Sequence, residues 1–539
     1  MKNNKMLKIS FLVVAVLALI ASCKKYDPNK LTSTAWSPNL AVPLAHGHFT
    51  VYDILARTDS NDVVIIDPST GAIALVYRGE IVSYQASDLV DMMDYSSTTT
   101  LTMASDFIIP PFGPYSGTQS ASQTNVVNPA LNSGVELYTT DFKGGTLTIG
   151  VSTDLMHDVD VTITIPDLLE NGTTPFTRTI NLTYSGAVPQ SGNQVVDLTG
   201  YVIDFTNGGT SFNEFDIQTD VTISGSGQGI SGTESVDVQC DFSNLQFEKC
   251  TGYFGQQSIA VDNDSILLRI FDNEPEGYFE LMDPRVRFTV TNEMGFPVEI
   301  ALSNLMTIEQ STGNTFVLTG YPATVDVPAP ASIGLSTTTI LELNQSNTGN
   351  LTTVITPTPQ WFYFEGNGIS NPNGNQSVNF LADTSVLRVD AEVEMPMEGL
   401  AYGFTVTDTI PFSFSENIDY IESLMFRINV DNGFPVELLG FAQVLDSNNN
   451  VLFDVWASPE NIIEPAPVDG NGRVTESYQK ITDIFLNDSQ IALIGQASYL
   501  VIGGEAQSLD GTTGQIVKLF EDYVIDLRVG MQVQGRFDL

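Results

Sequence analysis

Apolar and polar side chains alternate through long stretches of this chain. The clearest stretch is 523–539, where Ile525 and Leu527 lie on one face and Asp526 and Arg528 lie on the other. A period of two residues is that of a β-strand, and this alternation indicates one buried face and one solvated face. Such strands belong to antiparallel sheets, because parallel sheets are covered on both faces.

Turn residues separate these stretches, and helical periodicity is scarce. Segments such as 67–71 and 469–472 combine Asp with Gly, Pro, Ser or Asn, which are the residues that turns require. Short helices are expected only at 51–56, 87–93 and 478–485. Many short strands with little helix predict an all-β chain of tandem antiparallel β-sandwich domains, Ig-like in type.

One sequence segment occurs twice. Gly-Phe-Pro-Val-Glu at 295–299 recurs at 433–437. The strands before it also match, with Phe288, Val290 and Asn292 in one copy and Ile428, Val430 and Asn432 in the other. Pro is tolerated at the start of a strand, because a first residue need not donate to the ladder. A third, degenerate copy is expected to run from 147–151 into a strand at Val159, so that each sandwich holds one copy.

The N-terminus has the layout of a secretory signal. Three lysines within the first eight residues precede an apolar run at 11–20, which is too short to span a bilayer as a helix. The segment 20–23, Ile-Ala-Ser-Cys, resembles the lipobox of bacterial lipoproteins. The resemblance implies cleavage before Cys23, acylation of Cys23 and attachment to a membrane by lipid.

A looser resemblance extends along the chain. The segment 36–44, Trp-Ser-Pro-Asn-Leu-Ala-Val-Pro-Leu, and the Asn/Gly-Phe-Pro strands resemble multi-domain outer-membrane lipoproteins of Bacteroidota. In many lipoproteins an Asp directly after the lipidated Cys favours the inner membrane, whereas this chain has Lys24. The resemblance therefore implies the outer membrane, with the periplasmic face and the cell surface both left open.

These observations predict a serial domain order. The expected segments are a signal peptide at 1–22, a tether at 23–35, an N-terminal β-rich unit at 36–109, a linker or long loop at 110–136, and three β-sandwiches at 137–280, 281–418 and 419–539.

Net charge excludes one large class of partner. The chain has 21 basic and 64 acidic residues, a net charge of −43. Such a surface repels the phosphates of nucleic acids and anionic lipid head groups, so nucleic-acid binding is not expected and the lipid must provide the membrane attachment. Other envelope proteins are the expected partners.

Lipidation at Cys23 would leave two thiols, Cys240 and Cys250. An even pair in an oxidising compartment predicts a disulfide, provided that a turn near Ser243–Asn244 brings the two residues together. The alternative is a pair of buried, reduced thiols that pack as small apolar groups.

Candidate metal ligands are sparse. His46 and His48 would share one face of a strand, but a zinc site needs a third ligand and His157 is the only other histidine. We therefore expect no metal cofactor, while structural calcium in an acidic turn stays open. The candidate turns contain Asp59, Asn61 and Asp62; Asp262, Asn263 and Asp264; and Asp446, Asn448, Asn450 and Asp454.

The densest aromatic run is Trp-Phe-Tyr-Phe at 361–364. In a strand, Trp361 and Tyr363 share one face and the two phenylalanines the other, so at least one pair should be buried. Core packing of all four rings is the first interpretation. The alternative is a ligand platform made by Trp361 and Tyr363, whose rings carry polar tips.

Motifs of the common enzyme classes are missing from the sequence. It contains no Gly-x-Ser-x-Gly elbow and no phosphate loop, and histidine, the commonest general base, is scarce. We therefore expect no enzyme. The chain is interpreted as a lipid-anchored binding or scaffold protein of the cell envelope, a partner in an outer-membrane protein assembly. The alternative is a lipoprotein that captures glycans or nutrients beside a transporter, and a hydrolase ranks below both.

Overall fold

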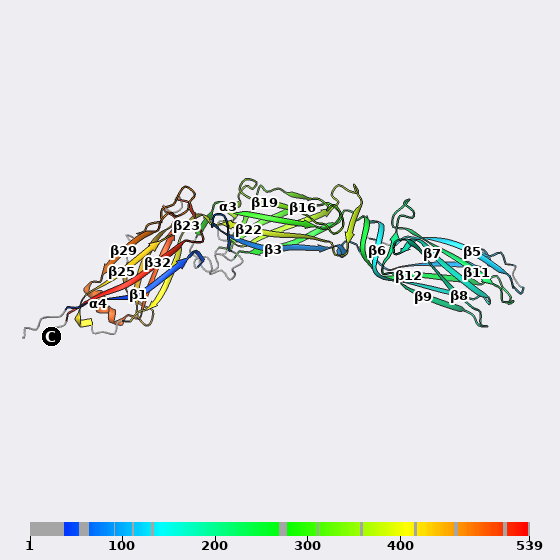
Figure 1. The fold of residues 1–539 in the computed structure, drawn as a ribbon, viewed down its shortest axis with the longest axis horizontal. Coiled ribbons are helices and arrows are strands. Elements are labelled where there is room, and N and C mark those ends of the chain that lie inside the picture. Colours follow the sequence, from blue (N-terminus) through cyan, green and yellow to red (C-terminus); the bar gives the residue numbers. More distant parts are fainter. Residues whose placement is uncertain are drawn as a thin grey trace, which may run out of the picture. The chain divides into compact units, whose positions relative to one another are not determined.

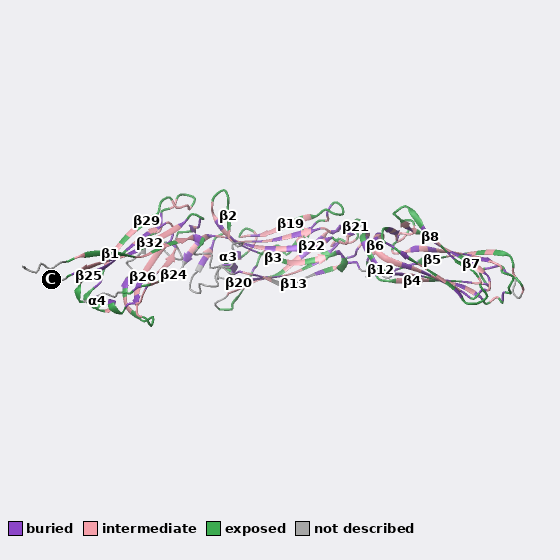
Figure 2. Ribbon diagram, turned by 60° about the horizontal axis from the view of Figure 1, so that its bottom comes forward, coloured by how far each residue is buried: buried purple, intermediate pink, exposed green. Residues whose placement is uncertain are grey.

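The computed structural model describes residues 37–52, 64–90, 92–109, 113–129, 131, 134–268, 278–309, 312–355, 359–413, 418–456, 462–509 and 515–536. Strands dominate these residues, and the ladders between them are antiparallel, which confirms the expected all-β class and its antiparallel sandwiches (Figure 1). Buried and exposed residues alternate along the strands (Figure 2), as the period of two requires. No helix in this part of the chain is long and apolar enough to cross a membrane.

The chain divides into two compact units. One unit consists of 1–57, 276–278 and 399–539, and the other of 58–275 and 279–398. The first unit holds one sandwich, called here the third sandwich. The second unit holds two, called the first and second sandwiches in the order in which the chain completes them.

The third sandwich packs two sheets around one core that includes Phe426, Ile428 and Leu500. One sheet has the order β1 (Asn39–Thr50), β32 (Val524–Gly535), β25 (Ile421–Asn432), β29 (Tyr478–Phe485). The other has the order β24 (Phe404–Pro411), β30 (Tyr499–Gln507), β26 (Glu437–Leu445), β27 (Val451–Trp456), with β28 (Ile462–Ile463) also paired to β26. Short helices are η3 (Ile418–Tyr420), α4 (Asp488–Leu493) and η4 (Ile494–Gln496).

The second sandwich also has two sheets. The first has the order β19 (Thr337–Leu343), β15 (Arg285–Asn292), β22 (Val386–Pro396), β3 (Ile73–Gln85), β2 (Val64–Ile66). The other has the order β13 (Ser258–Leu267), β20 (Pro359–Ser370), β16 (Val298–Glu309), β17 (Thr315–Val317), with β18 (Thr324–Val327) paired to β16. Short helices are η2 (Ala86–Asp88) and α3 (Leu351–Ile355), and β14 (Tyr278–Leu281) is a further short strand. In the first unit, β23 (Glu398–Tyr402), of which only Glu398 falls in the second unit, pairs with β31 (Val517–Lys518).

The first sandwich is built from one sheet that curls around its core. Its strands are β4 (Tyr95–Thr102), β5 (Thr118–Val127), β6 (Glu136–Thr153), β7 (Asp158–Glu170), β8 (Thr174–Leu182), β9 (Gln190–Asp197), β10 (Tyr201–Asp204), β11 (Phe215–Ser224) and β12 (Ser235–Tyr253), with β21 (Asn379–Ala382) at one edge. β10 pairs with both β6 and β7, which joins the two halves into one sheet. The core includes Phe205, Phe215 and Phe242, whose rings meet edge to face.

All three sandwiches have the same strand pairing. The order β29-β25-β32-β1 in the third corresponds to β19-β15-β22-β3 in the second and to β9-β6-β12-β4 in the first. The order β24-β30-β26-β27 likewise corresponds to β13-β20-β16-β17 and to β5-β11-β7-β8. The sandwiches are therefore copies of one module, and the degenerate third copy expected at 147–151 lies in β6, the counterpart of β15 and β25.

The copies are nested rather than serial. In the first sandwich, β4 through β12 follow one another along the chain. In the second, the whole first sandwich is inserted between the first strand, β3, and the next, β13. In the third, both other sandwiches are inserted between β1 and β24.

Nesting changes the expected domain order. The described strands β1, β3 and β4 of the expected N-terminal unit at 36–109 do not pair with one another, because each completes a different sandwich. The expected linker at 110–136 contains β5, which pairs with β11 along its whole length. The serial order assumed that neighbours in sequence are neighbours in space, which is usual but fails at each insertion. The expected helix at 478–485 is wrong, because these residues are β29.

The repeated segment is held by a buried asparagine. Asn292 donates to the carbonyl oxygens of Phe296 and Pro328 at 3.0 and 3.1 Å, and its own oxygen accepts the Met294 N–H at 2.9 Å. Both this residue and its counterpart Asn432 are fully buried. The side chain of Asn432 likewise binds Phe434 N, Val436 O and Glu464 O, at 3.0, 2.9 and 3.0 Å respectively.

The glycine of each copy is also required. A Cβ at Gly295 would lie 2.3 Å from the ring of Phe380, and one at Gly433 would lie 2.6 Å from the carbonyl oxygen of Val524. Each glycine N–H donates to the same neighbouring residue that limits the space. The motif thus binds the turn between the two sheets to an adjacent strand.

We expect Asn432→Ala to lower the free energy of unfolding by about 2 kcal/mol or more, because it leaves buried backbone groups without hydrogen-bond partners. Denaturant unfolding would measure the loss, and Asn292→Ala should behave alike. The control is Asn193→Ala at an exposed position, for which a change within about 0.5 kcal/mol is expected. Equal stability of Asn432→Ala and the parent chain would contradict the role of the motif.

Candidate functional site

Rows of charged and polar side chains lie on the outer faces of three equivalent sheets, one in each sandwich. In the second sandwich, a row of charges crosses four strands in register, in the order Glu342 (β19), Arg287 (β15), Glu392 (β22) and Arg78 (β3). Arg287 donates from Nε to Glu342 and from Nη1 to Glu392, both at 2.7 Å, and Arg78 Nε donates to Glu392 at 2.7 Å. Each charge in the row thus has an opposite charge beside it.

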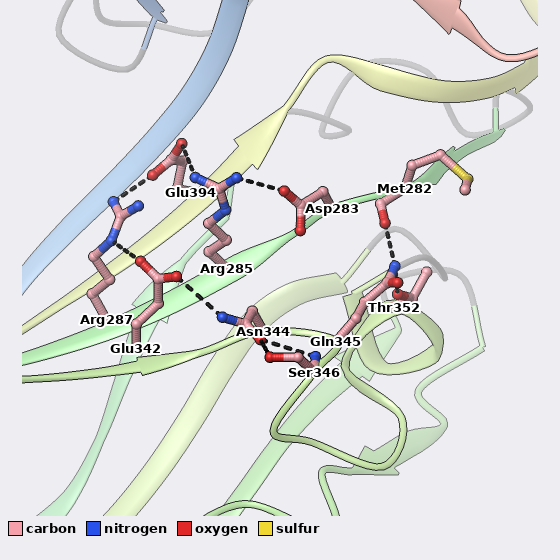
Figure 3. A network of polar contacts seen from close by, with 10 residues as sticks. All are labelled: Met282, Asp283, Arg285, Arg287, Glu342, Asn344, Gln345, Ser346, Thr352 and Glu394. Carbon is pink, nitrogen blue, oxygen red and sulfur yellow. Dashed lines mark hydrogen bonds and ion pairs between the residues drawn. The ribbon is translucent and has the colours of Figure 1, made fainter.

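A second row extends this network (Figure 3). Glu394 forms ion pairs with both Arg287 and Arg285, and Arg285 also binds Asp283 at 2.5 Å. Asn344 donates to Glu342 at 3.1 Å, on the side away from Arg287. Arg287 therefore contacts three carboxylates, those of Glu342, Glu392 and Glu394, which neutralise its charge within the network.

The network shifts the pKa values of its members. Burial alone would lower the pKa of Arg287, but hydrogen bonds to Glu342, Glu392 and Glu394 outweigh it and raise the pKa. The hydrogen bond from Arg287 is the main cause of the lowered pKa of Glu342. At Glu392 burial acts to raise the pKa, but the hydrogen bonds from Arg78 and Arg287 outweigh it, and the pKa is lowered.

The equivalent row of the third sandwich is incomplete. In register it reads Asp483 (β29), Arg427 (β25), Gly530 (β32) and Pro43 (β1). Arg427 binds Asp483 through Nε and Nη2, each at 2.6 Å. Gly530 has no side chain to offer, and a hollow of about 700 Å³ lies over the sheet at this point.

The neighbouring row supplies further donors. It runs from His46 (β1) to Arg528 (β32) to Asn429 (β25), and all three residues line the hollow. One row further, His48 Nδ1 lies 2.8 Å from Asp526 Oδ1, and His46 Nε2 lies 3.7 Å from the same oxygen. The hydrogen bond with His48 is the main cause of the lowered pKa of Asp526.

The first sandwich has a smaller hollow on the equivalent sheet, and one acid, Asp237, is among its lining residues. Its central row is Asn193 (β9), Gly150 (β6), Gln239 (β12) and Thr98 (β4), in register. The volume is about 370 Å³, and hydroxyl and amide groups dominate the lining. A Cβ at Gly150 would meet nothing within 4 Å, so the packing of the chain does not explain this glycine.

The expected disulfide is wrong. Cys240 and Cys250 are free and buried, and both lie on the single strand β12. Residues ten positions apart on a strand are about 30 Å apart, whereas a disulfide needs Cα atoms within about 7 Å. The expected turn at Ser243–Asn244 is a β-bulge, with Asn244 at φ 53°. Burial raises the pKa of Cys240 to about 12 and also raises that of Cys250, which keeps both thiols protonated.

The aromatic run divides between the two faces of β20. Phe362 and Phe364 are buried, as expected for at least one pair, and Phe364 meets Phe288 edge to face at 6.0 Å. Trp361 and Tyr363 are half-buried on the outer face, with ring centroids 6.4 Å apart. Their cross-strand neighbours on β16 are Ile308 and Met306. A ligand role for this pair stays a prediction.

Tertiary folding brings Asp526 to His46 and His48, but no group of three or more His, Cys, Asp or Glu among the described residues is arranged to hold a metal ion. In the turn after β26, Asp446 accepts the N–H groups of Asn448 and Asn450 at 2.8 and 2.9 Å. A hydrogen bond from the Asn450 side chain, together with these two, lowers the pKa of Asp446.

Other expected sites fall outside the description. Cys23 and the acidic turn at 59–62 lie outside the described residues, and so do the side chains at 262–264.

Sequence reasoning missed the incomplete row of the third sandwich. The signal was present, since the aligned copies that pair Asn292 with Asn432 also pair Arg287 with Arg427. The partners of these arginines on β22 and β32 could not be found in the same way, because register between strands distant in sequence is set by folding.

Comparisons with known proteins add little. No protein-family model matches the chain, and no curated protein matches its sequence. One solved structure to which it is similar is a candidate secreted protein from Parabacteroides distasonis ATCC 8503, at 11% identity and a TM-score of 0.32, covering 53% of this chain and 88% of that chain. Another is that of the infectious bursal disease virus Gt strain, at 9% identity and a TM-score of 0.15, covering 91% and 87%. These TM-scores are too low to carry an argument.

We expect Arg287→Gln to lower the free energy of unfolding at neutral pH by about 1 to 2 kcal/mol, after allowance for solvent screening of partly exposed groups. Glu342 and Glu392 have folded-state pKa values below the ordinary 4.5. Their stabilisation is therefore present above pH 4.5 and is lost as the pH falls through the folded pKa. The difference between variant and parent should shrink in acid, and a difference that is constant between pH 7 and pH 3 would refute the network.

Proposed function

We propose that this chain is a lipid-anchored, non-enzymatic binding or scaffold protein of the cell envelope and a partner in an outer-membrane protein assembly. The lipobox-like segment 20–23 provides the anchor, and the sandwiches present sheet faces and loops to partners. The observation that carries the proposal is the pairing of β1 with β32, the first and last of the described strands.

The pairing of β1 with β32 indicates which sandwich a lipid on Cys23 would attach to the membrane. A lipid on Cys23 would connect through 24–38 to β1, which is hydrogen-bonded into the third sandwich. Fully extended, that segment would span at most about 50 Å. The third sandwich would thus be the part tied to the membrane, and the other two sandwiches, inserted after β1, would be presented by it.

A second candidate is the capture of glycans or nutrients. The hollow of the first sandwich favours it, because Asn193, Gln239 and Thr98 offer hydroxyl and amide groups suited to sugar hydroxyls. The half-buried rings of Trp361 and Tyr363 offer a surface on which a sugar could stack.

We expect Cys23→Ser to release the protein from membranes, because one thiol carries the whole attachment. Fractionation of cells that express the variant should move the protein from the membrane pellet to the soluble fraction. Cys240→Ser is the matched control and should stay in the pellet. Recovery of the Cys23→Ser variant in the pellet would refute the anchor.

A pull-down separates the two candidate functions. In mild detergent, an assembly partner should co-purify with at least one outer-membrane protein in constant proportion, as measured by mass spectrometry. Isolation as a monomer would count against the assembly, and retention on a glycan array that is lost in Trp361→Ala and Tyr363→Ala would favour the second candidate.

A further inference from the structure

The second and third sandwiches differ at one structurally equivalent position. Arg287 and Arg427 each precede the buried asparagine of their copy by five residues, and each binds an acid on the neighbouring edge strand. On the other side, the strand partner of Arg287 is Glu392, whereas that of Arg427 is Gly530. The third sandwich therefore lacks the carboxylate that completes the row in the second.

The two arginines differ in the partner of one guanidinium nitrogen, Nη1. In the second sandwich, Nη1 of Arg287 binds Glu392. In the third, Nε and Nη2 of Arg427 bind Asp483, which leaves Nη1 for another acceptor. The hollow of about 700 Å³ lies over Gly530, where the Glu392 side chain stands in the other copy.

Other groups around the hollow also donate. Arg528 is exposed, and its guanidinium group forms no hydrogen bond or ion pair with another described residue, although its charge contributes to the lowered pKa of Asp526. The side-chain amide of Asn429 beside it likewise has no hydrogen bond to a described side chain or backbone group. The acids that face this region, Asp483 and Asp526, already accept from Arg427 and His48.

We propose that the hollow over Gly530 binds a small molecule whose carboxylate takes the place that Glu392 occupies in the second sandwich. Arg427 Nη1 and Arg528 would donate to its oxygens, as guanidinium groups do to carboxylates. The volume is in the usual range for small-molecule sites. This inference does not depend on the anchor or on the assembly partner.

Charge and lining narrow the class of ligand. The chain carries a net charge of −43, which repels a phosphate dianion more strongly than a singly charged carboxylate. Ala41, Pro43 and Met425 line the side of the hollow towards the start of β1, and their surface is apolar. The ligand is therefore an amphipathic monocarboxylate, with an apolar body beside its carboxylate.

Three probes test the class of ligand by isothermal titration calorimetry on the full chain in detergent. N-acetyl-leucine should bind at one site, and N-acetyl-leucinamide, which has the same body without the charge, should bind at least about tenfold more weakly. Glucuronate places the carboxylate on a polar ring and should also bind more weakly. The absence of N-acetyl-leucine binding, or equal binding of the amide, would overturn the proposal. Tighter binding of glucuronate than of N-acetyl-leucine would overturn the inference that the ligand has an apolar body.

Two variants locate the site. Gly530→Glu supplies the carboxylate internally, and the space around Gly530 accepts a Cβ, whose nearest neighbour would be Val42 O at 3.6 Å. This variant should lose N-acetyl-leucine binding, and Arg528→Gln should weaken it at least about tenfold. Arg388→Gln, an exposed arginine of the second sandwich, is the control and should bind like the parent. Circular dichroism would verify folding, and parental binding by folded Gly530→Glu and Arg528→Gln would refute the site.

Discussion

Each sandwich is closed by a backbone ladder between its first strand and its last. β4 pairs with β12, β3 with β22 and β1 with β32, and these ladders join residues that are in turn more distant along the chain. The loop entropy of closing a long segment grows only slowly with its length, so a whole sandwich can be inserted without preventing the outer ladder from forming. The nested order of the molecule depends on this property of strand pairing.

The ladders also decide where chemistry can occur. They place four strands side by side in each sandwich and bring residues that are distant in sequence into one row. The second sandwich fills this face with paired charges around Arg287, whereas the third leaves a gap at Gly530 beside Arg427 and Arg528. A module that is repeated for its core can therefore differ on its solvated face, because side chains there are not constrained by packing.

Sequence patterns predicted some elements and missed others for identifiable reasons. The alternation in 523–539 predicted β32, and the aligned copies predicted that Asn292 and Asn432 would correspond. The disulfide failed because Ser243–Asn244 looks like a hairpin turn in sequence but forms a bulge within a continuous strand. The residue pattern at 478–485 also fits a helix, although the alternating burial of these residues is that of an edge strand. In both cases a local pattern fitted two conformations, and pairing with a distant strand selected one.

The sequence by itself determined the all-β class, the strands with the clearest alternation, the repeated turn and the lipobox-like leader, because each depends on residues close together in the chain. Only the tertiary structure decided which strands share a sandwich, and therefore which polar side chains meet. Register between β25 and β32, or between β1 and β32, joins residues that no local pattern connects. The hollow over Gly530 forms only once that register is set, because residues of β1, β25 and β32 together line it.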